Sequence, residues 1–168
     1  MRKPKIYLET SAISHLEQPE KPSEQAYSIA MFERIKAGDF AVYLSEIVVD
    51  EINACSPEKR SALFQHISGI TFEDITVDDT VKALSRRIIA RGYLPKRSVA
   101  DSLHIAVAII AGCDYIISWN MKHIANVKTN KNIRHIIIDE GYKEIMLVPP
   151  SMILGGGMFD EGDSNNPG

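Results

Sequence analysis

Short β-rich segments alternate with helical segments along most of this 168-residue chain. Each β-rich segment is too short for a helix of ordinary length, and a capping residue or a glycine marks most of the helical boundaries. Neighbouring parallel strands must be joined by crossover connections, which are usually helices, so the alternation predicts an α/β protein with a mainly parallel sheet. We expect one domain over residues 1–154, built as a three-layer α/β/α sandwich.

The expected elements follow from the apolar spacing and the turn residues. We expect strands at residues 5–9, 40–45, 70–75, 113–118 and 134–139. We expect helices at about residues 10–16, 23–37, 45–55, 57–67, 76–92 and 99–111, and a further helix that Asn120 caps and that contains His123. The carboxyl ends of the strands then meet the following helices, which is where ligand sites form in open parallel sheets.

The composition is that of a globular domain with a polar tail. Hydrophobic residues make up 45% of the chain, which is enough for one well-formed core. Residues 155–168 are rich in glycine and acids and have little to bury, so we expect a flexible acidic tail outside the fold. The formal net charge is −3, and the three acids of the tail account for it, so residues 1–154 are neutral. Neutrality excludes a large non-specific nucleic-acid binder but is compatible with a local basic patch.

Targeting signals and cysteine spacing bear on the compartment. The first residues, MRKPKIYLETS, contain no apolar run long enough for a secretory signal, and no segment reaches the length of a membrane span. Cys55 and Cys113 have no spacing typical of a metal or redox pair, and we expect buried thiols in a reducing compartment. We therefore expect a cytoplasmic protein that does not bind membranes.

Polar residues interrupt the apolar segment VADSLHIAVAIIAGCDYIISWNMKHIAN, residues 99–126. Asp101 and His104 are three residues apart and therefore lie on the same side of the expected helix. One interpretation is structural: Asp101 favours the positive end of the helix dipole, and His104 is a hydrogen-bonded core histidine. The other is functional, because an unpaired acid on a buried helix costs several kcal/mol and a metal ion would supply the missing partner.

Two further acids occur where the expected topology places ligand sites. Glu9 ends the first strand, and Glu51 lies on an otherwise apolar helical face. Glu46 is a weaker candidate, because the helix dipole already explains an acid in a first turn. Each acid alone is weak evidence, but Glu9, Glu51 and Asp101 together favour a divalent-metal site.

Three segments resemble the PIN-domain nucleases, in particular the bacterial VapC toxins, over about residues 4–150. They are KIYLETSAISHL, LSEIVVDEI and ADSLHIAVAIIAGCDYIISWNMKHIAN, and the last is the most specific. The resemblance implies a three-layer α/β/α fold whose acidic residues bind Mg²⁺ or Mn²⁺ and cleave RNA. Glu9, Glu51, Asp101 and Asn120 match the four catalytic positions of the family, and the first three would be the metal ligands.

Other residues of the matching segments have weaker expected roles. Thr10 or Ser11 matches the hydroxyl beside the first acid of the family. His104, Trp119 and His123 belong to this version of the motif, and we include them only as weak candidates for contacting the substrate or supporting the ligands. Trp119 would stack on a base or fill the core, and core filling is favoured.

The resemblance implies an endoribonuclease that is the toxin of a toxin–antitoxin pair. Such a protein would bind a small antitoxin and form a homodimer, for which the exposed apolar residues of the helix at 23–37 are a candidate surface. The alternative is a catalytically degenerate module that binds RNA or protein, because Glu9 replaces the usual aspartate and Asn120 is neutral. A phosphatase ranks below both, since the sequence has no phosphate-binding glycine loop and no nucleophile elbow.

Overall fold

The structure, a computed structural model, describes residues 2–154, so the tail expected at residues 155–168 lies outside the described residues. Its strands are β1 (Lys5–Leu8), β2 (Ala41–Ser45), β3 (Glu73–Ile75), β4 (Tyr115–Ile117) and β5 (Met146–Val148). Its helices are α1 (Thr10–Ser14), α2 (Pro22–Lys36), α3 (Glu46–Asn53), α4 (Pro57–Ser68), α5 (Asp79–Ala90), α6 (Val99–Ile110) and α7 (Val127–Glu140), with a 3-10 helix at His15–Glu17. A further helical segment occupies residues 150–154.

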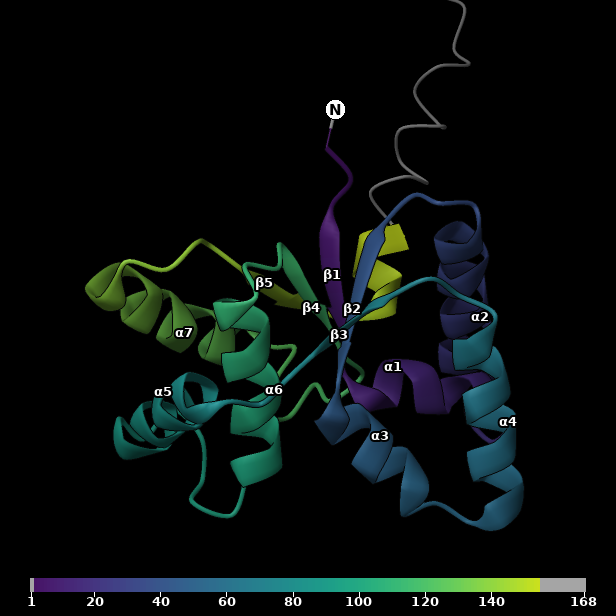
Figure 1. Ribbon diagram of the computed structural model, residues 1–168, viewed down its shortest axis with the longest axis horizontal. Helices are drawn as coiled ribbons and strands as arrows, with labels where there is room; N and C mark the ends of the chain where they lie inside the picture. The colour runs from purple at the N-terminus through teal and green to yellow at the C-terminus, as the bar shows by residue number, and fades with distance from the viewer. Residues whose placement is uncertain (1, 155–168) are drawn as a thin grey trace, which may run out of the picture.

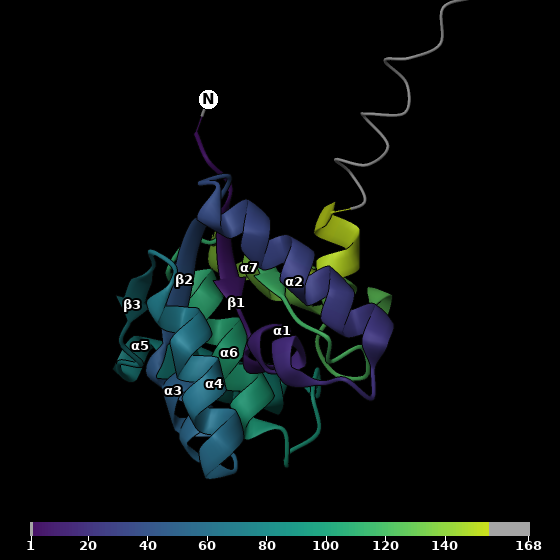
Figure 2. The same cartoon turned by 90° about the vertical axis from the view of Figure 1, so that its right-hand side faces the viewer.

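The five strands form one sheet in the order β3-β2-β1-β4-β5, and each neighbouring pair is parallel. Figure 1 shows α5, α6 and α7 on one side of the sheet and α1, α2 and α4 on the other. Figure 2, which views the molecule from the second side, shows α1, α2 and α4 in front of the strands. The expected three-layer α/β/α sandwich with a parallel sheet is confirmed.

The central strand β1 is apolar over most of its length. Helices cover both faces, so side chains on either side of β1 face the interior. Residues 6–8 of β1 are 0% exposed, and residues 105–109 of α6 pack into the same buried core. Such central strands have near-continuous apolar sequences, whereas the edge strand β3 contains the exposed acids Glu73 and Asp74.

The expectation that both cysteines are buried holds for one of them. Cys113 is buried as expected, whereas Cys55, just after α3, is only half-buried. Within residues 2–154, no helix is both long enough and apolar enough to cross a membrane. Neither cysteine forms a disulfide within the same described range.

The strand expected at residues 134–139 is wrong, because these residues belong to α7. Asn126 caps this helix through its side chain, which accepts a hydrogen bond in the first turn at 2.8 Å. Ile133 and Ile137, four residues apart, are buried, while Ile138 is 68% exposed. The cap and the apolar stripe outweigh the β propensity of the isoleucine run, and the last strand of the sheet is β5 instead.

Asp114, directly before β4, ties strands together at the amino-terminal edge of the sheet. Its Oδ2 atom accepts a hydrogen bond from the N–H of Lys5 at 2.8 Å, and its own N–H donates to the carbonyl of Lys5 at 2.8 Å. Its carbonyl accepts a hydrogen bond from the N–H of Met146 at 3.1 Å. Burial opposes the charge on Asp114, but the hydrogen bonds from Lys143 and from the Lys5 N–H outweigh it and lower the pKa of the carboxyl.

Asp114→Asn should therefore lower the free energy of unfolding by about 1–2 kcal/mol near pH 7, because a charge-assisted hydrogen bond is lost. A carboxyl whose pKa is lowered by folding adds stability above its unfolded-state pKa and loses it as the pH falls through the folded-state pKa. The deficit of the variant should shrink below about pH 4. Urea unfolding at pH 7 and pH 3 measures the loss of unfolding free energy and its dependence on pH. An equal loss at the two pH values would contradict the role of the charge.

Candidate active site

The predicted site residues lie at the carboxyl-terminal edge of the sheet. Glu9 directly follows β1, and Asn120 lies shortly after β4. Glu51 lies in α3, which begins directly after β2, and Asp101 lies in the first turn of α6. Figure 1 shows α1 and α3 below the ends of β1 and β2, with α6 beside them. The strand ends and helices thus carry the four residues as the topology predicts.

Glu9 is a buried N-cap residue of α1 and is only 6% exposed. Its Oε2 atom accepts hydrogen bonds from the N–H of Ser11 at 3.0 Å, from the hydroxyl of Ser11, and from the hydroxyl of Ser118 at 2.8 Å. Among the residues that the structure describes, no hydrogen bond reaches its Oε1 atom. The carboxylate of Glu9 thus turns back onto its own helix through one oxygen and keeps the other free of hydrogen bonds within the described residues.

Glu51 shows the same division between its two oxygens. Its Oε1 atom accepts hydrogen bonds from the hydroxyl of Thr10 at 3.2 Å and from Nε2 of His104. No hydrogen bond to Oε2 is present within residues 2–154. Burial opposes the charge on Glu51, but the hydrogen bonds from His104 and from the Thr10 hydroxyl outweigh it and lower the pKa of Glu51. The carboxylate is therefore ionised, oriented and open on one side.

Glu9, Glu51 and His104 bring potential ligand atoms within 4.8 Å of one another. Carboxylate oxygens are the ligands that Mg²⁺ prefers, and Mn²⁺ accepts both carboxylates and water. Two neighbouring carboxylates repel each other unless a cation lies close to both. The two carboxylates, which different elements supply and which each keep one oxygen free of hydrogen bonds within the described residues, thus have the chemistry that a divalent metal ion needs.

Asp101 does not join this cluster within the described part of the chain. Its Oδ1 atom accepts a hydrogen bond from Nδ2 of Asn120 at 3.2 Å, and its Oδ2 atom lies 3.1 Å from Nδ1 of His123. The Oδ1 atom of Asn120 accepts the N–H of His123 at 3.0 Å, so both polar atoms of this amide are engaged. Asn120 therefore contacts a carboxylate at the site without offering it a second negative charge.

The helix expected to contain His123 is wrong, because residues 121–126 form turns. Asn120 does cap this segment through the N–H of His123. The side chain of Asn126 donates a hydrogen bond back to the carbonyl of Met121 at 3.0 Å, which closes the turns before α7 begins. A compact turn, and not a helix, thus holds His123 against the carboxylate of α6.

Comparison with known proteins identifies the fold. No family model matches the chain, and no curated protein matches its sequence. A chain of VapBC2 from Rickettsia felis, crystallised with a DNA fragment from the promoter, matches with a TM-score of 0.56 at 13% identity, over 86% of this chain and 98% of the other. VapC20 of Mycobacterium tuberculosis, a toxin that cleaves the sarcin–ricin loop, matches with a TM-score of 0.53 at 15% identity, over 70% of this chain and 92% of the other. The chain has a VapC-like PIN-domain fold.

In this PIN-like fold, Trp119 connects the site to α1 and α2. Its N–H donates to the hydroxyl of Ser11 at 2.8 Å, and its indole N–H donates to the hydroxyl of Ser28 at 2.9 Å. Its ring centroid lies 5.9 Å from that of His15 and 6.3 Å from that of Tyr27. These contacts support packing as the main role of the half-buried ring, and base stacking stays a prediction.

The structure adds Tyr7, Ser45 and Ser118 to the site, none of which the sequence analysis included. The Tyr7 hydroxyl lies 2.7 Å from Nδ1 of His104 and 2.8 Å from the Ser45 hydroxyl. A tyrosine inside an apolar central strand is the one available signal, because a buried hydroxyl needs a hydrogen-bond partner. Ser45 is the last residue of β2 and Ser118 follows β4, and neither serine has such a signal in its spacing.

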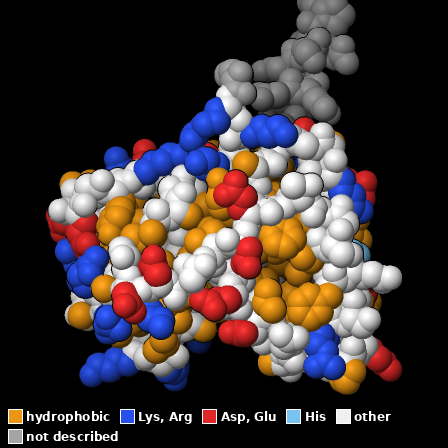
Figure 3. Space-filling model, viewed as in Figure 1, with side chains coloured by type: hydrophobic (Ala, Val, Ile, Leu, Met, Phe, Trp, Pro, Cys, Tyr) orange, Lys and Arg blue, Asp and Glu red, His pale blue; other side chains and the backbone are white. Residues whose placement is uncertain are grey.

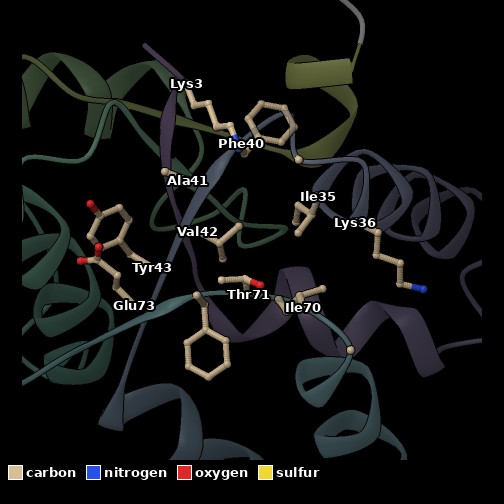
Figure 4. Close-up of a pocket in the computed structure, with 13 residues that line it drawn as sticks. Lys3, Ile35, Lys36, Phe40, Ala41, Val42, Tyr43, Ile70, Thr71 and Glu73 are labelled. Carbon is tan, nitrogen blue, oxygen red and sulfur yellow. The ribbon is translucent and has the colours of Figure 1, made fainter.

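A separate pocket of about 430 Å³ lies at the opposite edge of the PIN-like sheet. Figure 4 shows it between the start of β2, represented by Phe40, Ala41 and Val42, and the segment 70–73. The carboxylates follow the ends of parallel strands, whereas this pocket adjoins the beginning of one. It is therefore distinct from the carboxylate site.

Proposed function

We propose that the chain is a Mg²⁺- or Mn²⁺-dependent endoribonuclease and the toxin of a toxin–antitoxin pair. The observation that carries this proposal is the arrangement of Glu9 and Glu51. Each has one oxygen held by donors of the chain and one oxygen free, at the strand-end edge where a PIN-like sheet forms its site. Glu51 lies inside α3 and does not cap it, so helix capping does not account for both carboxylates.

The proposed metal ligands are Glu9, Glu51 and Asp101. A bound ion would lower the pKa of an attacking water and offset the charge of the phosphodiester. Asn120 and His123 position the carboxylate of Asp101 through the contacts at 3.2 and 3.1 Å. Asn120 thus acts on the site through Asp101, and neither of these two residues needs to bind the ion.

The proposed substrate and partners have support from two neighbouring folds. VapC20 is a toxin that cleaves the sarcin–ricin loop, and VapBC2 was crystallised with promoter DNA. For this chain we propose an RNA substrate, a small antitoxin that covers the acidic site, and a cytoplasmic location. A homodimer through α2 is a further proposal, because Tyr27 and Ile29 on that helix are 40% and 46% exposed.

Basic side chains beside the site suit an RNA backbone. Lys96 and Arg97 are exposed directly before α6, and Lys122 is exposed in the turn that contains His123. Within the described residues, none of the three forms an ion pair with an acid. Figure 3 shows acidic side chains across the middle of one face of the molecule and basic ones toward its edges, so positive charge does not cover the whole of that face. A local contact with phosphates is therefore favoured over broad non-specific binding.

A second function, RNA or protein binding without cleavage, is favoured by Asn120. In this chain the fourth family position has no charge, and its amide is fully engaged with Asp101 and His123. A module of this kind would keep the fold and the surface while holding the ion weakly or not at all. It would therefore bind RNA or a protein partner equally well after chelation of divalent ions.

A cleavage assay on metal-stripped full-length protein separates these functions. With a panel of structured RNAs, we expect cleavage with Mn²⁺ or Mg²⁺ that exceeds the chelated reaction by at least about 10³-fold. The single tryptophan, Trp119, reports binding independently through its fluorescence. Binding without cleavage at saturating ion would favour the second function. Neither binding nor cleavage would overturn the nuclease and the RNA-binding form of the second function.

A further inference from the structure

A buried chain of hydrogen bonds leads from Glu51 into the core. Nε2 of His104 bonds to Oε1 of Glu51. Nδ1 of the same ring lies 2.7 Å from the Tyr7 hydroxyl, which lies 2.8 Å from the Ser45 hydroxyl. Tyr7 and Ser45 are 0% exposed and His104 is 1% exposed. We call Ser45, Tyr7 and His104 the support chain, and the proposed function above assigns it no role.

Ser45 contributes to the support chain at the expense of its own helix. It is the N-cap residue of α3, with extended backbone angles, yet its side chain makes no capping hydrogen bond. An N-cap serine that bonds to its helix typically contributes about 1 kcal/mol of stability. Here the Ser45 hydroxyl contacts Tyr7 instead. The helix that Ser45 precedes, α3, carries Glu51. The Ser45 side chain thus forms a contact that leads to the Glu51 carboxylate and leaves the first turn of its own helix without a side-chain cap.

The protons of the support chain can be assigned from its ends. A tyrosine hydroxyl has one hydrogen to donate and can accept another, and that of Tyr7 has two partners, Nδ1 of His104 and the Ser45 hydroxyl. If Ser45 donates to Tyr7 and Tyr7 donates to Nδ1 of His104, the neutral ring carries its proton on Nε2. That proton then points at Oε1 of the ionised Glu51. Each donor in the chain is used, and the carboxylate receives the last one.

The contacts of Glu51 decide which of its two carboxylate oxygens is left for an ion. The hydroxyl of Thr10 and the ring of His104 both contact Oε1, so they hold the carboxylate in one orientation and leave Oε2 open. We propose that His104 is a positioning residue, fixed by Tyr7 and Ser45, that sets the affinity of the Glu9–Glu51 site for its divalent ion. This inference rests on the metal site of the proposed function and is independent of RNA cleavage.

Direct ligation by His104 through Nε2 is the competing role, because a ring nitrogen of His104 lies within 4.8 Å of an oxygen of each of the two carboxylates. Nε2 would then have to lose its proton and its hydrogen bond to Glu51, and Nδ1 would carry the proton toward Tyr7. A nitrogen ligand would also favour Mn²⁺ over Mg²⁺ more strongly than carboxylates alone. The two roles therefore differ in the tautomer of the ring and in ion selectivity.

The test is calorimetric binding of Mn²⁺ and of Mg²⁺ to metal-stripped full-length protein. His104→Leu should weaken binding of both ions by about 10- to 100-fold, as is typical when a group that orients a metal ligand is removed. His104→Gln should recover most of that loss, because its amide N–H can donate to Glu51 from a similar position. Tyr7→Phe, which removes only the hydroxyl, should give an intermediate loss.

His66→Leu is the matched control. Nε2 of His66 contacts Oε1 of Glu17 at 2.7 Å on the surface, so this variant removes the same kind of histidine–glutamate contact outside the site. It should bind both ions as the wild type does. Circular dichroism and urea midpoints confirm that each variant is folded before its binding is compared.

The outcomes that overturn the inference are distinct from those that overturn the proposed function. Wild-type affinity in folded His104→Leu, or no recovery in His104→Gln, would remove the positioning role while leaving the metal site intact. Absence of ion binding by the wild type would overturn the metal site itself. Nitrogen NMR of the His104 ring in the Mg²⁺-loaded protein should show Nε2 protonated, and an unprotonated Nε2 would assign His104 as a ligand instead.

Discussion

Glu51→Gln should reduce metal-dependent RNA cleavage by on the order of 10³-fold or more. Glutamine keeps the length of the side chain and an acceptor for Thr10 and His104, so the fold should be retained. It removes the negative charge of the Glu51 carboxyl, whose pKa the protein holds below its ordinary value. Loss of one anionic ligand removes several kcal/mol of electrostatic stabilisation, and each 1.4 kcal/mol corresponds to about tenfold in rate. Single-turnover cleavage at saturating Mn²⁺ measures the effect.

Glu46→Gln is the matched control for this prediction. Glu46 lies in the same helix, is exposed, and accepts a hydrogen bond from the N–H of Val77 at 2.9 Å. The same change of charge on α3 should leave cleavage within about threefold of the wild type, since surface charges are screened by solvent and salt. Cleavage by folded Glu51→Gln within tenfold of the wild type would exclude Glu51 as a metal ligand.

Asp101→Asn should lower cleavage by about 100-fold while weakening Mn²⁺ binding less than Glu51→Gln does. Asp101 lies outside the cluster of Glu9, Glu51 and His104, so those residues can still hold an ion without it. An amide cannot accept from both Asn120 and His123 as the two carboxylate oxygens do. Cleavage rates and calorimetric affinities, measured on the same preparations, separate the two effects.

Asp79→Asn tests the structural interpretation of Asp101. Asp79 is the first-turn acid of α5, so its replacement removes the same favourable interaction with a helix dipole, of about 0.3–1 kcal/mol. It should change neither cleavage nor ion binding. If Asp101→Asn behaves like Asp79→Asn, the acid of α6 serves only its helix, and the proposed ligand set would be reduced to Glu9 and Glu51.

The order of elements was predictable because its signals are local. Helix caps, glycines and the alternation of apolar spacing lie within a few residues of each boundary, and they placed β1 to β4 and α1 to α6 near their observed positions. Residues 134–139 show where such signals fail. Their isoleucines favour a strand, but the cap at Asn126 and the burial of Ile133 and Ile137 produce a helix.

The candidate site was predictable only in part. Glu9, Glu51 and Asp101 attract notice because acids interrupt apolar segments at positions that a parallel sheet brings to one edge. Their different surroundings are not visible in the spacing. Glu9 and Glu51 share a cluster with His104, whereas Asp101 faces Asn120 and His123.

By itself, the sequence determined the α/β class, the parallel sheet and the acids at its carboxyl edge, because periodicity, caps and chain order are properties of short segments. Only the tertiary structure decided which oxygen of each acid is free and which donors hold the other. Those contacts join Tyr7 to residues 38 and 97 positions away, and Glu51 to a histidine 53 positions away. Hydrogen bonds between such distant residues depend on how the helices pack on the sheet, which local spacing does not encode.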